Sequence, residues 1–587
     1  MEESKLQEAV DSLGTQSKLE KLVELSIAIS KEKNHNVLLE KILFGGQKLA
    51  NADAATLYIR TDDDQLRFAI RSMDDVLPSF TIPLFDPDTG EPRHRNISTH
   101  VALTGKTVRI SDIYNDEHGF DVSGTRMFDR STGYRTVSML TVPLSPREGE
   151  IIGVLQLINA KHPETGDIVD FTEEMASFCS ALSSQAAIAL ENHNLIMAHR
   201  ELVDSVVQVI ASAIDAKSSH TGGHCERVPK LVEQIAREAH ESSKAPFKDF
   251  NMADDEAWRE LLLSAWLHDC GKVTTPEHIV DKATKLETKY NRIHEIRMRF
   301  EVLHRDAEIE YLKGLQKGSS KLEQYDKLQE RLMWLDEAYA FICDCNIGGE
   351  FLSPDKVERL KVIAKESWAR NYSDRLGLSH MELEQLDDIP SPDLPAKEQL
   401  LADKLEHIIK WPKGERLDID QKHKFNIKIP DCMSNLGELH NLSVSRGTLT
   451  EEDRFLINEH VIQTILMLEQ LPKIKGLANL IEYAGGHHET LTGSGYPRGL
   501  DATKMSMPAR IIAMSDIFEA LTASDRPYKK AKTLSEAVKI MGFMKDDGHI
   551  DPDLFQLFLK SGIYLKYANT YLQPHQIDAV DVGEYLE

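Results

Sequence analysis

The residues whose types and spacing most clearly suit metal or acid–base chemistry are 485–489, with the sequence GGHHE, where two adjacent histidines precede a glutamate. A glycine-rich turn follows and ends at Tyr496 and Pro497. Neighbouring side chains on a helix point about 100° apart, so His487 and His488 suit a position where a helix ends and the backbone bends. Two neutral imidazoles there could bind one metal ion, or one edge each of a metal cluster. On its own such a pair is usually a surface turn, so its interpretation depends on the other histidines and acids.

Further candidate ligands lie at the ends of apolar stretches. His268 and Asp269 end a run that begins at Trp258, and Lys272 follows three residues later. A carboxylate beside an imidazole can bridge two metal ions about 3.5–4 Å apart, and the lysine could reach a phosphate oxygen or a leaving oxygen. Asp516 ends the apolar stretch 507–516, where an acid is rarely buried unless it is paired or binds a metal. A carboxylate that caps a neighbouring helix is the plainer alternative for Asp516.

The candidate metal ligands all lie on or next to predicted helices: His224, His268, Asp269, His460, His487, His488 and Asp516. Five imidazoles and two carboxylates suit two or three divalent transition metals better than Mg²⁺ or Ca²⁺. The lack of cysteine in this set argues against a structural zinc site.

The composition describes an ordinary globular chain of 587 residues, 41% of them hydrophobic, which is long enough for two to four domains. With 69 Lys+Arg against 95 Asp+Glu the net charge is -26, so we expect neither nucleic acid nor a membrane surface as partner. A phosphate-ester substrate would need local metal ions or cationic side chains. Six scattered cysteines indicate reduced thiols, and the sequence has neither a signal peptide nor a long apolar run, so we predict a cytoplasmic protein.

The N-terminal third predicts an α+β domain over residues 18–195, after a tail at 1–17. Helical periodicity over 19–50 breaks at Asn34, and strand-like stretches follow at 54–60, 66–71, 107–111, 138–144 and 151–159. The stretches FDRSTGYRT (128–136), MLTVPL (139–144) and GVLQLIN (153–159) resemble the GAF domains of cyclic-nucleotide phosphodiesterases. The resemblance implies either a small-molecule ligand or a domain that only dimerises, and both alternatives stay open.

Residues 172–217 contain no proline and no glycine and carry an apolar stripe at helical spacing. This pattern predicts one long helix that links two domains and pairs in a homodimer. Such a helix could transmit a rotation or a register shift from sensor to output, or it could be a rigid spacer.

The ligand motifs of the second half, taken in order, are similar to the HD-GYP family, a branch of the HD phosphohydrolases, over about 200–300 and 440–570. The resemblance implies an all-helical domain over 200–587, hydrolysis of cyclic di-GMP to pGpG and then GMP, and a di- or trinuclear centre of iron, with manganese as the alternative. It also implies that the seven candidate residues bind the metals, that Asp269 bridges them, and that Lys272 acts near the scissile phosphate. By the same resemblance, Gly493, Gly495, Tyr496 and Pro497 shape the substrate pocket, while Arg526 and Lys529 hold phosphate or guanine.

The chain departs from the family pattern at three places. Thr492 stands where many members have an aspartate, and His220 stands where a tyrosine or a third-metal glutamate is usual, so His220 could bind a third metal. The largest departure is an insertion over about 284–440, which predicts a charged helical hairpin at 285–342 and a proline-rich loop at 388–397. The insertion makes His294 a rival to His460, and the spacing to the histidine pair favours His460. A lid, a dimer arm and a docking surface for other signalling proteins all remain open as its role.

Three functions therefore compete. The first is a GAF-regulated cyclic di-GMP phosphodiesterase. The second is a catalytically weak cyclic dinucleotide receptor that serves as a scaffold, and the third is a phosphodiesterase for another cyclic dinucleotide such as cyclic GMP-AMP. The complete ligand set, together with Lys272, favours an enzyme, because a scaffold would not need all seven metal positions.

Overall fold

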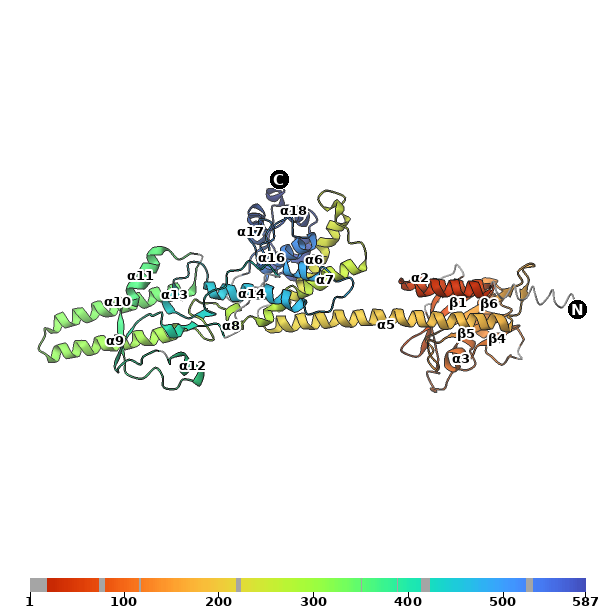
Figure 1. Ribbon diagram of the computed structural model, residues 1–587, viewed down its shortest axis with the longest axis horizontal. Coiled ribbons are helices and arrows are strands. Elements are labelled where there is room, and N and C mark those ends of the chain that lie inside the picture. Colours follow the sequence, from red (N-terminus) through yellow and green to blue (C-terminus); the bar gives the residue numbers. More distant parts are fainter. Residues whose placement is uncertain are drawn as a thin grey trace. The chain divides into compact units, whose positions relative to one another are not determined.

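The structure is a computed structural model that describes residues 18–72, 80–115, 118–217, 223–349, 351–387, 389–412, 423–523 and 531–586 (Figure 1). The chain divides into two compact units, Met1–Val203 and Asp204–Glu587. His220, Arg526 and Lys529 fall outside the described residues.

The first unit is built on one antiparallel sheet with the strand order β3-β2-β1-β6-β5-β4, with β7 paired to β6. Its strands are β1 (Ala52–Arg60), β2 (Gln65–Arg71), β3 (Thr81–Pro83), β4 (Val108–Ile110), β5 (Met139–Leu144), β6 (Gly153–Lys161) and β7 (Ile168–Val169). Each of the five expected strand stretches is present, with bounds shifted by at most two residues. The predicted α+β class of this unit is therefore confirmed.

Helices cover both faces of the sheet. A helix over 18–30, α2 (His35–Leu49) and the start of α5 (Glu173–Lys217) share one apolar core with β1, β5 and β6. The helices α3 (Ile97–Thr104) and α4 (Ser123–Thr132) complete the unit. The predicted break at Asn34 is confirmed, because its side chain caps α2 by accepting hydrogen bonds from the N–H groups of Asn36 and Val37.

The linking helix is also confirmed, since α5 runs without interruption for 45 residues. Apolar side chains stay exposed along its second half, among them Leu202 at 62% and Val209 at 68%. Exposed apolar residues at helical spacing are typical of helices that pair with another helix. The homodimer remains a prediction.

The second unit is largely helical, as predicted. Its main helices are α6 (His224–Glu241), α7 (Asp255–Leu267), α14 (Glu451–Leu468), α15 (Leu480–Gly485), α16 (Met507–Thr522), α17 (Leu534–Asp546), α18 (Pro552–Lys560) and α19 (Ile563–Tyr571). One apolar core contains residues of α6, α7 and α16 to α19, so segments on either side of the insertion fold together. The short helices η3 (Cys270–Thr274) and α8 (Glu277–Val280) lead from α7 toward the insertion.

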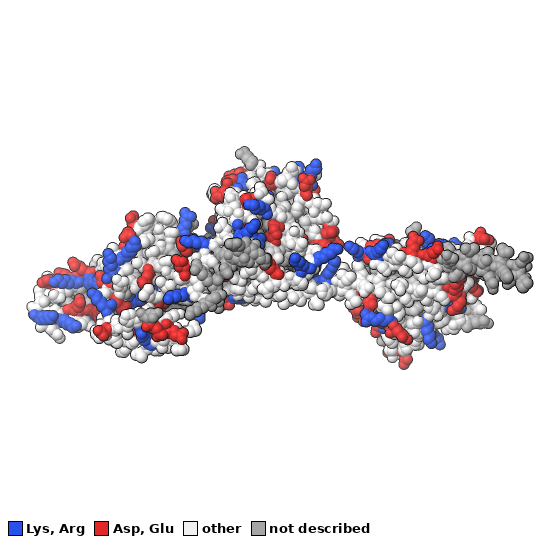
Figure 2. Space-filling model, viewed as in Figure 1, with Lys and Arg blue, Asp and Glu red and all other residues white. Residues whose placement is uncertain are grey.

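The insertion has a core of its own, formed mainly by the hairpin helices α9 (Ile293–Gln316) and α10 (Lys321–Ile347), which run side by side (Figure 1). It also contains α11 (Pro354–Ala364), α12 (His380–Gln385), α13 (Glu438–Leu442) and two short antiparallel pairs: β8 (Ser367–Arg370) with β9 (Ala396–Gln399), and β10 (Ile408–Ile409) with β11 (Ser434–Asn435). On the face that Figure 2 shows, acidic and basic side chains are interspersed along the hairpin. The pairs Glu301–Arg305 and Glu323–Lys327 follow the i,i+4 spacing that supports an exposed helix.

Two boundaries differ from the prediction. Helix α9 begins at Ile293 rather than near residue 285, because the preceding segment is held as a loop. There the buried Lys285 ammonium donates to the carbonyls of Leu442 and Val444 at 2.9 and 2.7 Å. The proline-rich loop ends earlier than predicted, because β9 begins at Ala396.

Candidate metal centre

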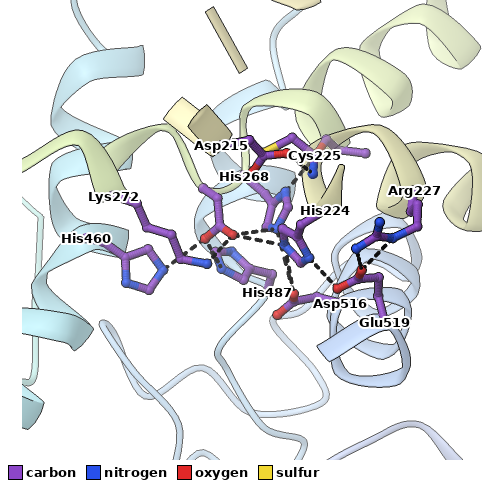
Figure 3. Close-up of polar contacts among 12 residues, drawn as sticks. Asp215, His224, Cys225, Arg227, His268, Lys272, His460, His487, Asp516 and Glu519 are labelled. Atoms are coloured by element: carbon purple, nitrogen blue, oxygen red, sulfur yellow. Dashed lines mark hydrogen bonds and ion pairs between the residues drawn. The ribbon is translucent and has the colours of Figure 1, made fainter. Parts of the chain in front are cut away.

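The seven candidate ligands converge in the second unit, although they come from helices and turns far apart in the sequence. Their ligand atoms form two groups, each within 4.8 Å: His224, His268, Asp269 and Asp516 in the first, and His460, His487 and His488 in the second. Figure 3 shows the side chains of His224, His268, His487 and Asp516 pointing toward a common centre.

Asp269 lies between the two groups. Its Oδ2 is 3.1 Å from Nε2 of His224 and 3.2 Å from Nε2 of His268. Its Oδ1 is 3.2 Å from Nε2 of His460 and 3.8 Å from Nε2 of His487. One carboxylate oxygen therefore faces each ligand group, which is the arrangement that a bridging ligand requires.

The chemistry of these atoms fits a metal centre. Within the described part of the chain, the buried Nε2 atoms of His268, His460 and His487 have no hydrogen-bond partner, and neither has Oδ1 of Asp269. A buried polar atom without a partner is costly and rare in folded proteins. Four such atoms gathered at and around Asp269 fit divalent cations that accept their lone pairs.

Three of the imidazoles are oriented in the same way. Nδ1 of His268 lies 2.8 Å from the carbonyl oxygen of Ala265, and Nδ1 of His487 lies 2.6 Å from that of Ala484. His460 repeats the contact with the carbonyl three residues before it. An Nδ1–H group that donates to this carbonyl leaves Nε2 as the ligand atom, so the local backbone selects the ring orientation.

His224 is oriented by a glutamate that sequence reasoning missed. Nδ1 of His224 lies 2.5 Å from Oε2 of Glu519, whose other oxygen accepts from Arg227 Nε at 2.8 Å. Glu519 is buried on α16 three residues after Asp516. Residues three apart share a helix face, so the two acids in one apolar run were the available signal.

The two histidines of the first ligand group are protonated when no metal is bound, and they face ionised carboxylates. Burial lowers the pKa of His224, but Glu519 and Asp269 outweigh it and raise the pKa from 6.5 to about 9. Burial also opposes the charge of His268, and Asp269 raises its pKa to about 10. Burial likewise opposes the ionisation of Asp269, but His268 and Lys272 keep the pKa of that carboxyl well below its ordinary value.

The adjacent histidines of the second ligand group, His487 and His488, have the opposite state. Burial, together with the charge of His268, lowers the pKa of His487 to about 3. Burial and His487 hold the pKa of His488 well below its ordinary value. Both imidazoles are therefore neutral near pH 7 and ready to donate a lone pair.

Lys272 lies beside the first group, where its Nζ is 2.5 Å from Oδ2 of Asp269. Burial lowers the pKa of this amine, but Asp269 and Asp516 outweigh it and raise the pKa, so the lysine stays charged. The side chain keeps 30% exposure and can reach a ligand that enters from solvent. A neighbouring cavity of about 30 Å³, lined by Asp215, Cys225 and Lys272 among others, has room for a water but not for a nucleotide.

Gly271 brings the two ligand groups together. A Cβ on Gly271 would overlap the carbonyl oxygen of His460 and lie 2.6 Å from the backbone nitrogen of Thr464. The Gly271 N–H instead donates to Oγ1 of Thr464 at 2.9 Å. The turn that carries Asp269 therefore lies directly against the backbone of α14, which carries His460.

The Gly-Tyr-Pro turn is fastened to the second group. The Tyr496 ring stacks on His488 with centroids 4.8 Å apart and planes at 15°. Glu489 accepts the N–H groups of Arg498 and Leu500 at 2.7 and 2.8 Å. Gly495 lies so close to the chain that a Cβ would sit 2.5 Å from Cα of Glu489.

The remaining predicted residues are placed as follows. Gly493 has a φ of 77° in the same turn, and Pro497 is buried at its end. Thr492 is exposed, and its hydroxyl lies 2.8 Å from that of Ser494. The rival His294 contacts Arg297 at the start of α9, whereas Nε2 of His460 lies 3.2 Å from Oδ1 of Asp269.

None of the helices in the described residues combines the length and the apolar character that a membrane span requires.

Comparisons with known proteins agree with this architecture. A family model described as GAF domain matches residues 34–190, and one described as HD domain matches residues 395–554. The chain is 30% identical over 166 residues to the 3'3'-cGAMP-specific phosphodiesterase 1 of Vibrio cholerae. It is 36% identical over 148 residues to the 3'3'-cGAMP-specific phosphodiesterase 3 of the same organism. It is 37% identical over 119 residues to a cyclic di-GMP phosphodiesterase of Pseudomonas aeruginosa.

These alignments cover 28%, 25% and 20% of the chain and 36%, 30% and 28% of the respective relatives. The HD match contains His460, His487, His488 and Asp516, and the shared core joins it to the helices that carry His224 and His268. The chain therefore contains a GAF domain in its N-terminal part and an HD domain in its C-terminal part.

Proposed function

We propose that this protein is a metal-dependent phosphodiesterase that hydrolyses cyclic di-GMP to pGpG and then to GMP, under the control of its GAF domain. The observation that carries the proposal is the position of Asp269 between two ligand groups whose buried atoms lack hydrogen-bond partners. The similarity to named cyclic dinucleotide phosphodiesterases supports the same reaction class.

Each candidate ligand has a place in the proposed metal centre. Two or three divalent ions, iron or alternatively manganese, would lower the pKa of a water and neutralise charge on the phosphoryl oxygens. His224, His268 and Asp516 would hold one side of this centre, His460, His487 and His488 the other, and Asp269 would join them. Four of these histidines, His224, His268, His460 and His487, need no rearrangement, since their Nδ1 atoms are already held by carbonyls or by Glu519.

Lys272 would hold the scissile phosphate. Its ammonium reaches Asp269 and remains partly exposed, so an entering phosphate oxygen can share it. The net charge of -26 repels a dianionic substrate, and local cations must overcome this repulsion. We assign the same task to Arg526 and Lys529, and we assign the wall of the pocket to the turn that contains Gly493, Gly495, Tyr496 and Pro497.

Control by the GAF domain is supported by contacts at the end of α5. Arg259, on the helix that leads to His268, pairs with Asp204 of α5 at 2.6 Å. Lys217, the last residue of α5, donates to the carbonyl of Thr275 at 2.8 Å and also to that of Val273. A displacement of α5 would pull on the turn that carries Lys272.

A second substrate, 3'3'-cGAMP, is favoured by the names of the two Vibrio relatives. The test is turnover of both dinucleotides by protein purified without oxygen, with metal content measured on the same sample. We expect pGpG and GMP from cyclic di-GMP, with two to three iron or manganese ions per chain. Preferential cleavage of 3'3'-cGAMP would make that dinucleotide the substrate in place of cyclic di-GMP. A fully metallated protein that binds both dinucleotides without cleaving them would instead support a receptor.

A further inference from the structure

The insertion returns to the metal centre through residues 423–427, which lie between the two elements that carry the second ligand group. We propose that Phe425 and Asn426 are positioning residues for the group formed by His460, His487 and His488. The inference rests on the proposed function only in taking that group to hold a metal ion.

The first contact is with α14. Phe425 is 8% exposed and forms an apolar core with Val461, Ile462 and Ile465. Val461 and Ile462 directly follow His460, so the ring of Phe425 packs on the helix beside the ligand. Because protein interiors are close-packed, the volume of Phe425 fixes where this part of α14 lies.

The second contact is with the Gly-Tyr-Pro turn. The N–H of Asn426 donates to the carbonyl oxygen of Pro497 at 2.6 Å. Tyr496 packs against the apolar core that contains Phe425, and the Arg498 guanidinium lies 5.9 Å from the centre of the Phe425 ring. Since Tyr496 stacks on His488, the segment also supports the far side of the ligand group.

The segment is anchored independently of these contacts. The His423 ring stacks on Phe425 with centroids 5.2 Å apart and planes at 10°. Nε2 of His423 lies 2.7 Å from Oε2 of Glu469, the C-terminal cap of α14. Phe425 is therefore held from both sides and acts as a wedge between α14 and the turn.

Loss of the Phe425 wedge should affect the two ligand groups unequally. None of the contacts described for 423–427 reaches His224, His268 or Asp516 of the first ligand group. Loss of the wedge should weaken one class of metal sites and spare the other. Ligand positions must be held to within about 0.5 Å for a working site, so a small relaxation of α14 is sufficient.

The test is a Mn²⁺ titration of the metal-free, full-length protein, followed by electron paramagnetic resonance. Phe425→Ala should weaken one class of sites by about tenfold, the size typical of losing a residue that orients ligands, and leave the other class unchanged. Phe425→Leu, which keeps most of the apolar volume, should restore the wild-type titration. Phe300→Ala is the matched control, because Phe300 is 6% exposed in the separate core of the insertion.

Asn426→Pro tests the same idea without a cavity, since it removes the N–H that Pro497 accepts. It should weaken the same class of sites. Unchanged titrations of Phe425→Ala and Asn426→Pro, or equal weakening by Phe300→Ala, would overturn the proposal. The titration uses the metal alone, so a wild-type protein that binds Mn²⁺ but cleaves no cyclic dinucleotide would contradict the proposed function and leave this inference standing.

Discussion

The Glu519 carboxylate lies 2.5 Å from Nδ1 of His224, while Nε2 of the same ring faces Asp269 at 3.1 Å. The ring is thus held from behind by one acid and aimed at the centre beside another. Since Glu519 pairs with His224 and Arg227, this relationship makes it a determinant of metal affinity.

Replacing Glu519 with glutamine should lower metal affinity by about tenfold or more, because the amide stabilises the imidazole less and fixes its orientation less firmly. Metal titration of the purified variant measures this effect. Glu482→Gln is a suitable control, since Glu482 pairs with Ser506 instead. Equal affinities in wild type and Glu519→Gln would show that His224 needs no support.

The metal-free protein should lose stability as the pH rises above about 6.5. The pKa values of His224 and His268 are raised in the fold to about 9 and about 10, against 6.5 ordinarily. Their favourable charge is fully present below pH 6.5 and is lost as the pH rises through these values. Urea unfolding of the metal-free protein at pH 6, 8 and 10 measures the slope, which His268→Asn should flatten.

The same protonation makes metal binding release protons, so apparent affinity should increase from pH 6 to pH 9. Calorimetric titration in buffers of different ionisation enthalpy counts the protons released. An affinity that stays constant across this range would contradict the charged state of His224 and His268.

Gly271→Ala should separate the two ligand groups, because the added methyl would overlap the His460 carbonyl. We expect about 1–3 kcal/mol of destabilisation, as is usual for overpacking, together with loss of turnover. Gly349→Ala is the control, since a Cβ there meets no atom within 4 Å. Denaturant unfolding and turnover of both variants decide the matter, and a fully active Gly271→Ala would mean that the turn and α14 can move apart freely.

Lys217→Met removes the ammonium that holds the carbonyls of Val273 and Thr275. A hydrogen bond from a charged group contributes about 1.5–3 kcal/mol, so the turn that carries Lys272 should loosen. Turnover should fall while metal content stays constant. Lys230→Met, which removes an exposed pair with Glu226 on α6, should change neither quantity.

Much of the molecule follows from patterns that are local in sequence. The uninterrupted run before Lys217 predicted α5, and the charged periodic stretch predicted the hairpin, because both signals repeat every few residues. The ligands were found through adjacent residues such as His268 and Asp269, and through their resemblance to a known family. Spacing alone favoured His460 over His294. The structure distinguishes them, because His460 lies beside Asp269 and His294 contacts Arg297.

The missed features depend on contacts between distant parts of the chain. Helix α9 begins later than predicted because Lys285 donates hydrogen bonds to carbonyls more than 150 residues away. Sequence periodicity contains no signal for such contacts. Phe425 is one of three alternating apolar residues, with Ile427 and Ile429, and its role is not evident until α14 is seen beside it. Glu519 was visible only as a second acid on the Asp516 face of an apolar helix.

The most direct test of the account is Asp269→Asn, measured for metal content and for cyclic dinucleotide turnover on the same anaerobic sample. The variant keeps the size of the side chain but weakens the bridge between the two ligand groups. We predict that metal content and turnover fall together, while Asp546→Asn, at an exposed acid on α17, behaves as wild type. Turnover at the wild-type level in Asp269→Asn would contradict the assignment of this centre as the active site.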